Sequence, residues 1–79
     1  MRITVKLFAS LHKYQPEAPR TGLGVDVPEG SDIAAVLPRL GVPDRAPLVA
    51  MVNEKVEHLD RVLKEGDVLS LFPPIAGGC

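Results

Sequence analysis

The residues with the clearest potential for chemistry stand at the end of the sequence, as Gly77-Gly78-Cys79. Glycine has no Cβ, so a glycine pair passes a narrow channel and presents an unhindered carbonyl for acyl transfer. The same pair also occurs in frayed chain ends without any function. Pro73-Pro74 strengthen the first interpretation and leave both open, because proline ends a sheet ladder and prefers an extended backbone. The sequence therefore predicts a tail, residues 74–79, that reaches on the order of 20 Å when extended.

Other residue types with chemical potential give weaker signals. His12 and His58 lie far apart and show no metal-ligand spacing, so we expect surface histidines and no bound metal. Ser31 has no nucleophile context and is better explained as a helix cap. Gly22-Leu23-Gly24 lacks the rest of any phosphate-loop fingerprint, so no bound cofactor is expected.

Composition excludes several classes of protein. The net charge is -1, and no basic stripe of the kind that binds nucleic acid is present. The start Met1–Lys6 alternates charged and apolar residues, unlike a secretory signal, and no window approaches the roughly 20 apolar residues of a membrane span. The single cysteine, Cys79, cannot form an internal disulfide. We therefore expect a cytoplasmic protein that binds neither nucleic acid nor membranes.

The elements that must position the tail begin with two strands. Residues 2–9 alternate, with Ile3, Val5 and Leu7 on one face. A second alternating run covers 23–27 and ends at Pro28-Glu29-Gly30. We expect the polar segment 10–22 between the two strands to be a long connection.

The segment 31–41 predicts one helix. Ser31 is the expected N-cap with Asp32 in the first turn, and Gly41 stands where a C-cap belongs. Pro38 predicts a kink or an early end, because it removes a hydrogen bond inside a helix. The apolar side chains fall at helical spacing and form one stripe, namely Ile33, Val36, Leu37 and Leu40.

The last part of the chain predicts further strands. Leu48–Val52 is an apolar run of strand length, Asn53-Glu54 is a turn, and Lys55–Glu57 is a brief strand. Leu59–Leu63 suggests a single helical turn, and a turn at Lys64–Asp67 precedes the last predicted strand, Val68–Phe72. The order predicts an α+β domain at 1–73, with four to five strands in a mixed sheet and one main helix on one face. If the last strand pairs in parallel with the first, the fold is the β-grasp, or ubiquitin-like, fold.

Several segments resemble the MoaD/ThiS family of ubiquitin-like sulfur carriers, and the resemblance covers essentially the whole chain. The end is similar to the molybdopterin-synthase small-subunit branch of that family. The segments that carry the resemblance are Val5-Lys6-Leu7-Phe8-Ala9-Ser10-Leu11, Val52-Asn53 with Val56, Lys64-Glu65-Gly66-Asp67, and Leu71-Phe72-Pro73-Pro74-Ile75-Ala76-Gly77-Gly78. The most specific piece is Pro-Pro followed three residues later by Gly-Gly.

The resemblance implies a carrier without catalytic residues of its own. On this resemblance Gly78 is the acyl carrier, and Gly77 is the preceding residue, which has no side chain. An ATP-dependent activating enzyme adenylates the terminal carboxylate, sulfur replaces the adenylate as a thiocarboxylate, and the tail delivers sulfur to a cofactor precursor. The implied partners are that activating enzyme, which binds the ATP, and a sulfur-accepting large subunit or other acceptor.

Two departures from the family pattern concern Cys79 and the turn at Asn53-Glu54. With Cys79 present, Gly78 lies in a peptide bond and has no carboxylate to adenylate. A processing protease removes Cys79, or its thiol is functional, or the residue is silent in a divergent member. At the turn the family often has Asn-Gly, so a wider turn is expected here.

The sequence also predicts an apolar docking patch. Phe8 and Phe72 fall on the sheet face opposite Ile3 and Leu71 if the helix covers the latter. A small second core under loop 10–22 is the other interpretation of the same residues. The residues assigned to docking beside the tail are Phe8, Met51, Phe72, Pro73 and Pro74.

Three functions follow from these observations. The first is a sulfur carrier for molybdopterin-type cofactor assembly, active after removal of Cys79. The second is a ubiquitin-like modifier whose Gly78 is joined to lysines. The third is a β-grasp interaction module with an inert tail.

Overall fold

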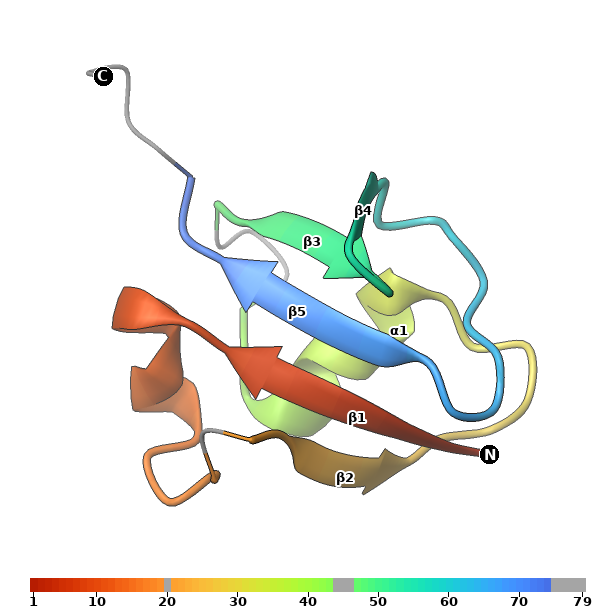
Figure 1. The fold of residues 1–79 in the computed structure, drawn as a ribbon, viewed down its shortest axis with the longest axis horizontal. Coiled ribbons are helices and arrows are strands. Elements are labelled where there is room, and N and C mark those ends of the chain that lie inside the picture. Colours follow the sequence, from red (N-terminus) through yellow and green to blue (C-terminus); the bar gives the residue numbers. More distant parts are fainter. Residues whose placement is uncertain (20, 44–46, 75–79) are drawn as a thin grey trace.

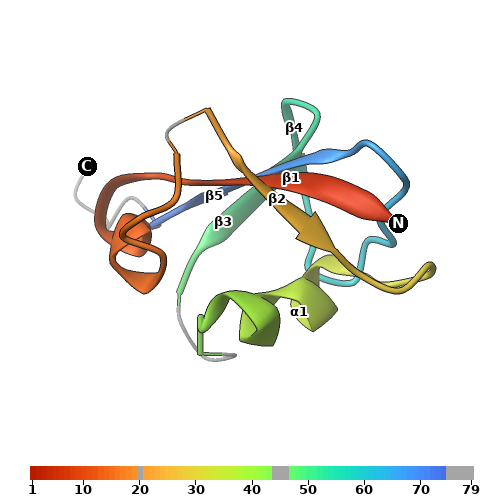
Figure 2. The same ribbon diagram turned by 90° about the horizontal axis from the view of Figure 1, so that it is seen from below.

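The computed structural model describes residues 1–19, 21–43 and 47–74, which form a mixed five-stranded sheet with a short helix on one face (Figures 1 and 2). The sheet order is β2-β1-β5-β3-β4. Central strands β1 and β5 are parallel, and the other neighbours are antiparallel. This topology confirms the predicted β-grasp fold. The elements are β1 Arg2–Leu7, β2 Leu23–Asp26, α1 Ile33–Val36, β3 Val49–Val52, β4 Lys55–Glu57 and β5 Val68–Phe72.

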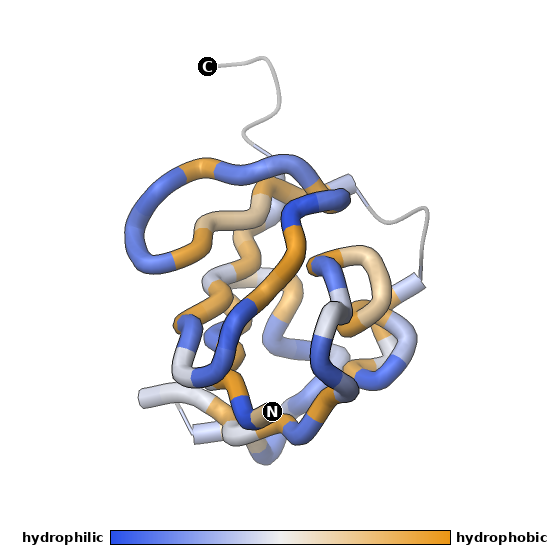
Figure 3. Tube along the Cα trace, turned by 90° about the vertical axis from the view of Figure 1, so that its right-hand side faces the viewer, coloured by the Kyte–Doolittle hydropathy of each residue, from blue (hydrophilic) through white to orange (hydrophobic). Residues whose placement is uncertain are grey.

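The core lies between the sheet and α1. Buried and more exposed residues alternate along β1 and β5, and hydrophobic (orange) and hydrophilic (blue) stretches follow one another closely along the tube in Figure 3. The alternation directs every second side chain toward the helix. Burying each large aliphatic side chain contributes about 1.5–3 kcal/mol. The core residues of the central strands and the helical segment are Ile3, Val5, Ile33, Val36, Leu37, Leu40, Ala50, Val52, Leu69 and Leu71.

Pro38 ends the α-helix early, as the sequence predicts. The α-helical hydrogen bonding stops at Val36, and Leu37–Leu40 continues as a 3₁₀ helix. Gly41 caps this segment in the left-handed conformation, with φ of 80°. Its N–H donates to the carbonyls of Leu37 and Pro38. The apolar stripe therefore stays continuous although the helix type changes.

The predicted N-cap at Ser31 is wrong, because Asp32 is the cap. The Asp32 Oδ1 accepts from the Ala35 N–H at 2.9 Å. The Ser31 hydroxyl instead donates to the Pro28 carbonyl at 2.7 Å and closes the preceding turn. An isolated bridge between Asp32 and Val62 fixes where the extended backbone ends and the helix begins.

The same bridge limits the helical turn predicted at Leu59–Leu63: the Arg61 N–H donates to the His58 carbonyl at 3.0 Å and closes one turn, after which the backbone is extended. Arg61 and Leu63 pair in an extended manner with the residues before α1. The Ile33 N–H donates to the Arg61 carbonyl at 3.1 Å, and the Leu63 N–H donates to the Ser31 carbonyl at 2.8 Å. Backbone pairing across the fold therefore outweighs the local helical preference of this short segment.

The connection between β1 and β2 is more structured than the sequence predicts. Ala9–Tyr14 forms a 3₁₀ helix, which places Leu11 in the main core with 4% of its surface exposed. The Gln15 Nε2 donates to the Leu40 carbonyl at 2.8 Å and ties the connection to the end of the helical segment. Strand β1 accordingly ends at Leu7, two residues earlier than predicted.

The turn between β3 and β4 is tight, so the wider turn that we expected is wrong. Val52 pairs with Lys55, which leaves a two-residue loop. Asn53 and Glu54 have φ values of 51° and 74°. A type I′ turn requires positive φ at both positions, which asparagine tolerates better than glutamate.

Replacing Glu54 with glycine should stabilise the domain by roughly 0.5–1 kcal/mol. The left-handed conformation costs a side-chain-bearing residue about 1–2 kcal/mol, and the entropy of glycine in the unfolded chain offsets part of the gain. Urea unfolding measures the difference. Glu54→Ala is the matched control, since it removes the same carboxylate but keeps Cβ. An equal gain in both variants would attribute the effect to charge and contradict the backbone explanation.

Candidate functional site

The predicted sulfur-carrying residues Gly77 and Gly78, and the processing residue Cys79, lie outside the described residues. The described chain ends at Pro74, which is also the first residue of the predicted tail 74–79. The boundary between the domain and the tail therefore stays a prediction. The structure does describe the base from which these residues continue.

Strand β5 stops where the two prolines were expected to stop it. Phe72 is its last residue and pairs with Val49 of β3. Pro73 is half-buried and Pro74 is exposed. Neither proline has an N–H to donate to β3, so the ladder ends there.

An aromatic pair joins the ends of the two central strands. The rings of Phe8 and Phe72 are stacked, with centroids 4.5 Å apart and an interplanar angle of 9°. The Phe8 N–H donates to the Leu71 carbonyl at 3.0 Å, which extends the pairing of β1 with β5 beyond the last residue of β1. Ala9 follows with φ of 53°, so the chain turns sharply away after Phe8. Phe8 nevertheless remains 38% exposed.

The uncovered face of the sheet divides into an apolar and a charged part. On the apolar part Met51 lies opposite Val56 of β4 and Ser70 of β5. Val56 is 68% exposed. On the charged part the Arg2 Nε lies 3.2 Å from the Asp26 Oδ1. The predicted position of Phe72 and Met51 on this face agrees with the register, whereas their docking role stays a prediction.

Sequence reasoning missed Val56 as a member of this face. A signal was present, because a two-residue turn at Asn53-Glu54 places Val56 directly opposite Met51. The expectation of a wider turn concealed that register. The exposed apolar surface therefore extends from the end of β5 to the edge strand β4.

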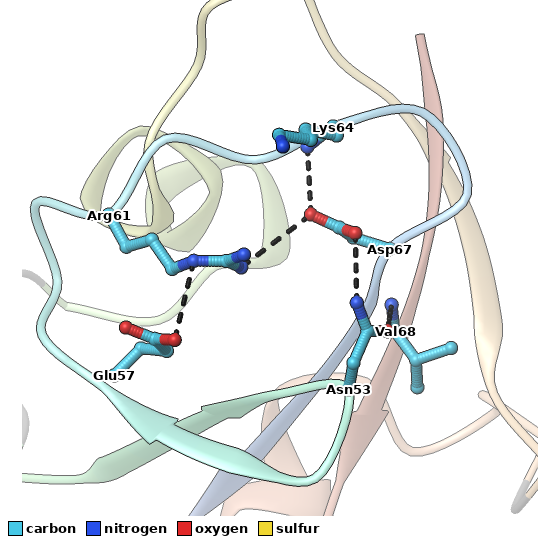
Figure 4. Close-up of polar contacts among 6 residues, drawn as sticks. All are labelled: Asn53, Glu57, Arg61, Lys64, Asp67 and Val68. Carbon is cyan, nitrogen blue, oxygen red and sulfur yellow. Dashed lines mark hydrogen bonds and ion pairs between the residues drawn. The ribbon is translucent and has the colours of Figure 1, made fainter.

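The other end of β5 is held by a polar cluster that the sequence did not reveal (Figure 4). Asp67 is only 7% exposed, and its carboxylate accepts from the Asn53 Nδ2 at 3.0 Å and the Lys64 N–H at 2.8 Å. The Asn53 Oδ1 accepts from the Val68 N–H at 3.0 Å. We call Asn53, Lys64, Asp67 and Val68, together with Glu57 and Arg61, the Asp67 clasp.

Within the clasp, Arg61 links Asp67 to Glu57, the last residue of β4. Its Nε lies 3.4 Å from the Glu57 Oε2, and its Nη1 lies 3.6 Å from the Asp67 Oδ2. The clasp joins the β3–β4 turn, the segment 58–67 and the start of β5. It therefore supports the sheet at the end remote from Phe72.

The two histidines do not come together. His12 is half-buried and lines a surface pocket of about 420 Å³ with Leu7, Phe8 and Ala9. Its Nε2 lies 3.2 Å from the Ala18 carbonyl oxygen. His58 is exposed on the segment after β4. Within residues 1–19, 21–43 and 47–74, no group of three or more His, Cys, Asp or Glu residues is placed to hold a metal ion.

The described helices also bear on the membrane question. In the part of the chain that the structure describes, none is long and apolar enough to cross a membrane.

Comparisons with known proteins agree with this geometry. The model of the ThiS family matches residues 5–78. SAMP1 from Haloferax volcanii superposes with a TM-score of 0.75 at 26% identity, covering 99% of this chain and 100% of that chain. A protein assigned as molybdopterin converting factor subunit 1 from Pyrococcus furiosus superposes with a TM-score of 0.75 at 21% identity, covering 95% of this chain and 99% of that chain. No curated protein matches significantly in sequence.

A further solved structure is a complex. A chain of the protein–protein complex of subunits 1 and 2 of molybdopterin-converting factor from Helicobacter pylori superposes with a TM-score of 0.63 at 21% identity, covering 99% of this chain and 100% of that chain. At 21% identity this likeness shows the shared fold. The family match, in contrast, includes Gly77 and Gly78 and stops before Cys79.

Proposed function

The chain belongs to the ThiS family, as its resemblance to the MoaD/ThiS carriers predicted, and from that premise we propose that it carries sulfur on Gly78 for molybdopterin-type cofactor synthesis. The observation that carries the proposal is the family match itself, which runs from Val5 through Gly78. The ThiS and MoaD proteins are small carriers, so the proposed role is that of a substrate for partner enzymes.

The chemistry begins once Gly78 has a free carboxylate. We propose that a protease hydrolyses the peptide bond between Gly78 and Cys79. A carboxylate oxygen of Gly78 then attacks the α-phosphorus of ATP, and pyrophosphate leaves. A persulfide sulfur donor displaces AMP from the acyl adenylate, and reduction of the resulting acyl disulfide by a thiol leaves the thiocarboxylate. An activating enzyme binds the ATP for these steps.

The surface beside the tail supports a role in docking. The stacked pair Phe8 and Phe72 leaves apolar area at the base of the tail, and the exposed Val56 extends it across the uncovered sheet face to β4. Apolar patches of this kind mark protein interaction sites, and burial of aromatic rings supplies much of the binding energy. We assign docking of the activating enzyme and of a sulfur-accepting subunit to Phe8, Met51, Phe72, Pro73 and Pro74.

A second function has specific support. Small archaeal modifier protein 1 from Haloferax volcanii superposes with a TM-score of 0.74 at 24% identity. The shared fold is compatible with attachment of Gly78 to lysines of other proteins. Both functions need the same activated glycine, so the product distinguishes them.

Intact-mass measurement of the protein from its native cells tests the proposal. During cofactor synthesis we expect a chain that has lost Cys79 and in which one oxygen of the Gly78 carboxylate is replaced by sulfur. Lysine-linked adducts that end in Gly78 would favour the modifier. An unaltered full-length chain as the only species would contradict both functions.

A further inference from the structure

The aromatic pair Phe8 and Phe72 lies at the end of the sheet from which the tail continues. Phe72 is the last residue of β5 and directly precedes Pro73. The ring of Phe8, which comes from the end of the parallel neighbour β1, lies flat against it at 4.5 Å. Offset stacking at this separation is an attractive aromatic geometry.

The backbone holds the pair in register. The Phe8 N–H donates to the Leu71 carbonyl, one residue before Phe72, at 3.0 Å. On the other side Phe72 pairs with Val49. Phe72 is therefore restrained by both neighbouring strands and by the ring of Phe8.

The turn after Phe8 has an energetic cost. Ala9 adopts a φ of 53°, a conformation that costs a residue with a Cβ about 1–2 kcal/mol. This turn directs the chain into the 3₁₀ helix Ala9–Tyr14 and leaves the Phe8 ring at the end of the sheet. Strain of this kind persists only where the surrounding structure determines it.

The residues after Phe72 transmit its orientation. A residue that precedes proline is restricted to extended conformations, and proline fixes its own φ near −65°. The first restriction applies at Phe72 and Pro73, and the second applies at Pro73 and Pro74. We call these three residues the stem, since the remaining tail continues from them.

We propose that Phe8 is a positioning residue: by stacking on Phe72 it sets the direction in which the stem leaves the sheet. This inference rests on the proposed function, because direction matters only if Gly78 must reach a catalytic centre. A small misplacement of a reacting group lowers the rate of the chemical step within the bound complex. A residue that only docks would instead change the affinity of the complex.

Phe8→Leu separates positioning from docking. Leucine keeps an apolar side chain of similar size but has no ring face to stack on Phe72. In adenylation of a chain ending at Gly78, we expect kcat to fall roughly three- to tenfold, with KM for the carrier within about twofold. Phe8→Tyr restores the ring and should restore kcat. Met51→Glu, which places a charge on the uncovered face away from the stem, should raise KM and retain kcat.

A measurement on the carrier alone makes the inference independent of the enzyme. Residual dipolar couplings of the Cα–Hα bonds of the stem report its orientation, prolines included. We expect smaller couplings in Phe8→Leu and native values in Phe8→Tyr, while the couplings of β3 stay unchanged in both.

The outcomes that overturn the inference are distinct. A raised KM with unchanged kcat in Phe8→Leu would mean that Phe8 contributes to docking alone and does not position the stem. Unchanged stem couplings in Phe8→Leu would show that the Phe8 ring does not orient the stem. Smaller stem couplings with an unchanged kcat would show that the orientation of the stem does not affect adenylation. If the native chain ending at Gly78 is not adenylated at all, the proposed function fails, and the couplings alone then decide whether Phe8 orients the stem.

Discussion

A chain that ends at Gly78 should be adenylated by its activating enzyme about 100-fold faster, or more, than the same chain with Cys79 retained. In the retained chain the Gly78 carbonyl belongs to an amide, which has no oxygen free to attack ATP. The Cys79 carboxylate lies one residue further along, at a distance of roughly 3.3–3.6 Å when extended. Misplacement of a reacting group by about 1 Å already costs on the order of 100-fold.

ATP–pyrophosphate exchange with the activating enzyme from the same cells measures this difference. A chain that ends at Gly77 is the matched control, since it has a terminal glycine carboxylate but is one residue too short; we expect it to be inactive. A second control ends in Gly78→Ala, which adds a single methyl group beside the reacting carboxylate. Equal exchange by the full-length chain would assign the reaction to Cys79 and contradict the role of Gly78.

The sheet could be predicted because its signals are local and periodic. Strands β1 and β5 alternate with period 2, and in a strand that alternation directly determines which side chains face the core. Pro38 and Gly41 likewise act through their own backbone restrictions, which no tertiary contact alters. The predictions at β1, β5, Pro38 and Gly41 were therefore correct because each depends on local backbone geometry alone.

The errors arose where a distant segment decides the local structure. Ser31 and Asp32 are both good caps, and the bridge from Asp32 to Val62 selects between them. The same bridge draws the residues from Arg61 to Leu63 into an extended backbone. The turn at Asn53-Glu54 is tight because the register of β3 with β4 imposes it, even though glutamate is poorly suited to positive φ.

The candidate site shows the same division. Side-chain alternation placed Phe8 and Phe72 on one face, and that placement agrees with the structure. Their stacking depends on the positive φ of Ala9, and alanine gives no sequence signal for such a turn. The tail residues that carry the proposed chemistry were recognisable only by their types and order.

The spacing of residues in the sequence does not reveal the Asp67 clasp, because its members come together only in the folded chain. Asp67→Ala should lower the free energy of unfolding by about 3 kcal/mol. The substitution removes two hydrogen bonds to a carboxylate that is 7% exposed, and it leaves the Asn53 amide and the Arg61 guanidinium without that partner. Hydrogen bonds to charged groups contribute about 1.5–3 kcal/mol each, so the loss of these two bonds accounts for a cost of this size. For a domain of this size the midpoint of thermal unfolding should fall by roughly 12 °C or more.

Chemical denaturation of Asp67→Ala, Asn53→Ala and the double variant shows whether the clasp acts as a unit. Asp67 and Asn53 share a hydrogen bond of 3.0 Å, so the double variant should lose less than the two single variants together, with a coupling of about 0.5–2 kcal/mol. Asp60→Ala is the matched control, because Asp60 is an exposed aspartate of the same segment and should change stability by less than about 0.5 kcal/mol. Strictly additive losses would mean that each side chain acts separately. In that case the two side chains would stabilise the start of β5 independently, and the clasp would not be a structural unit.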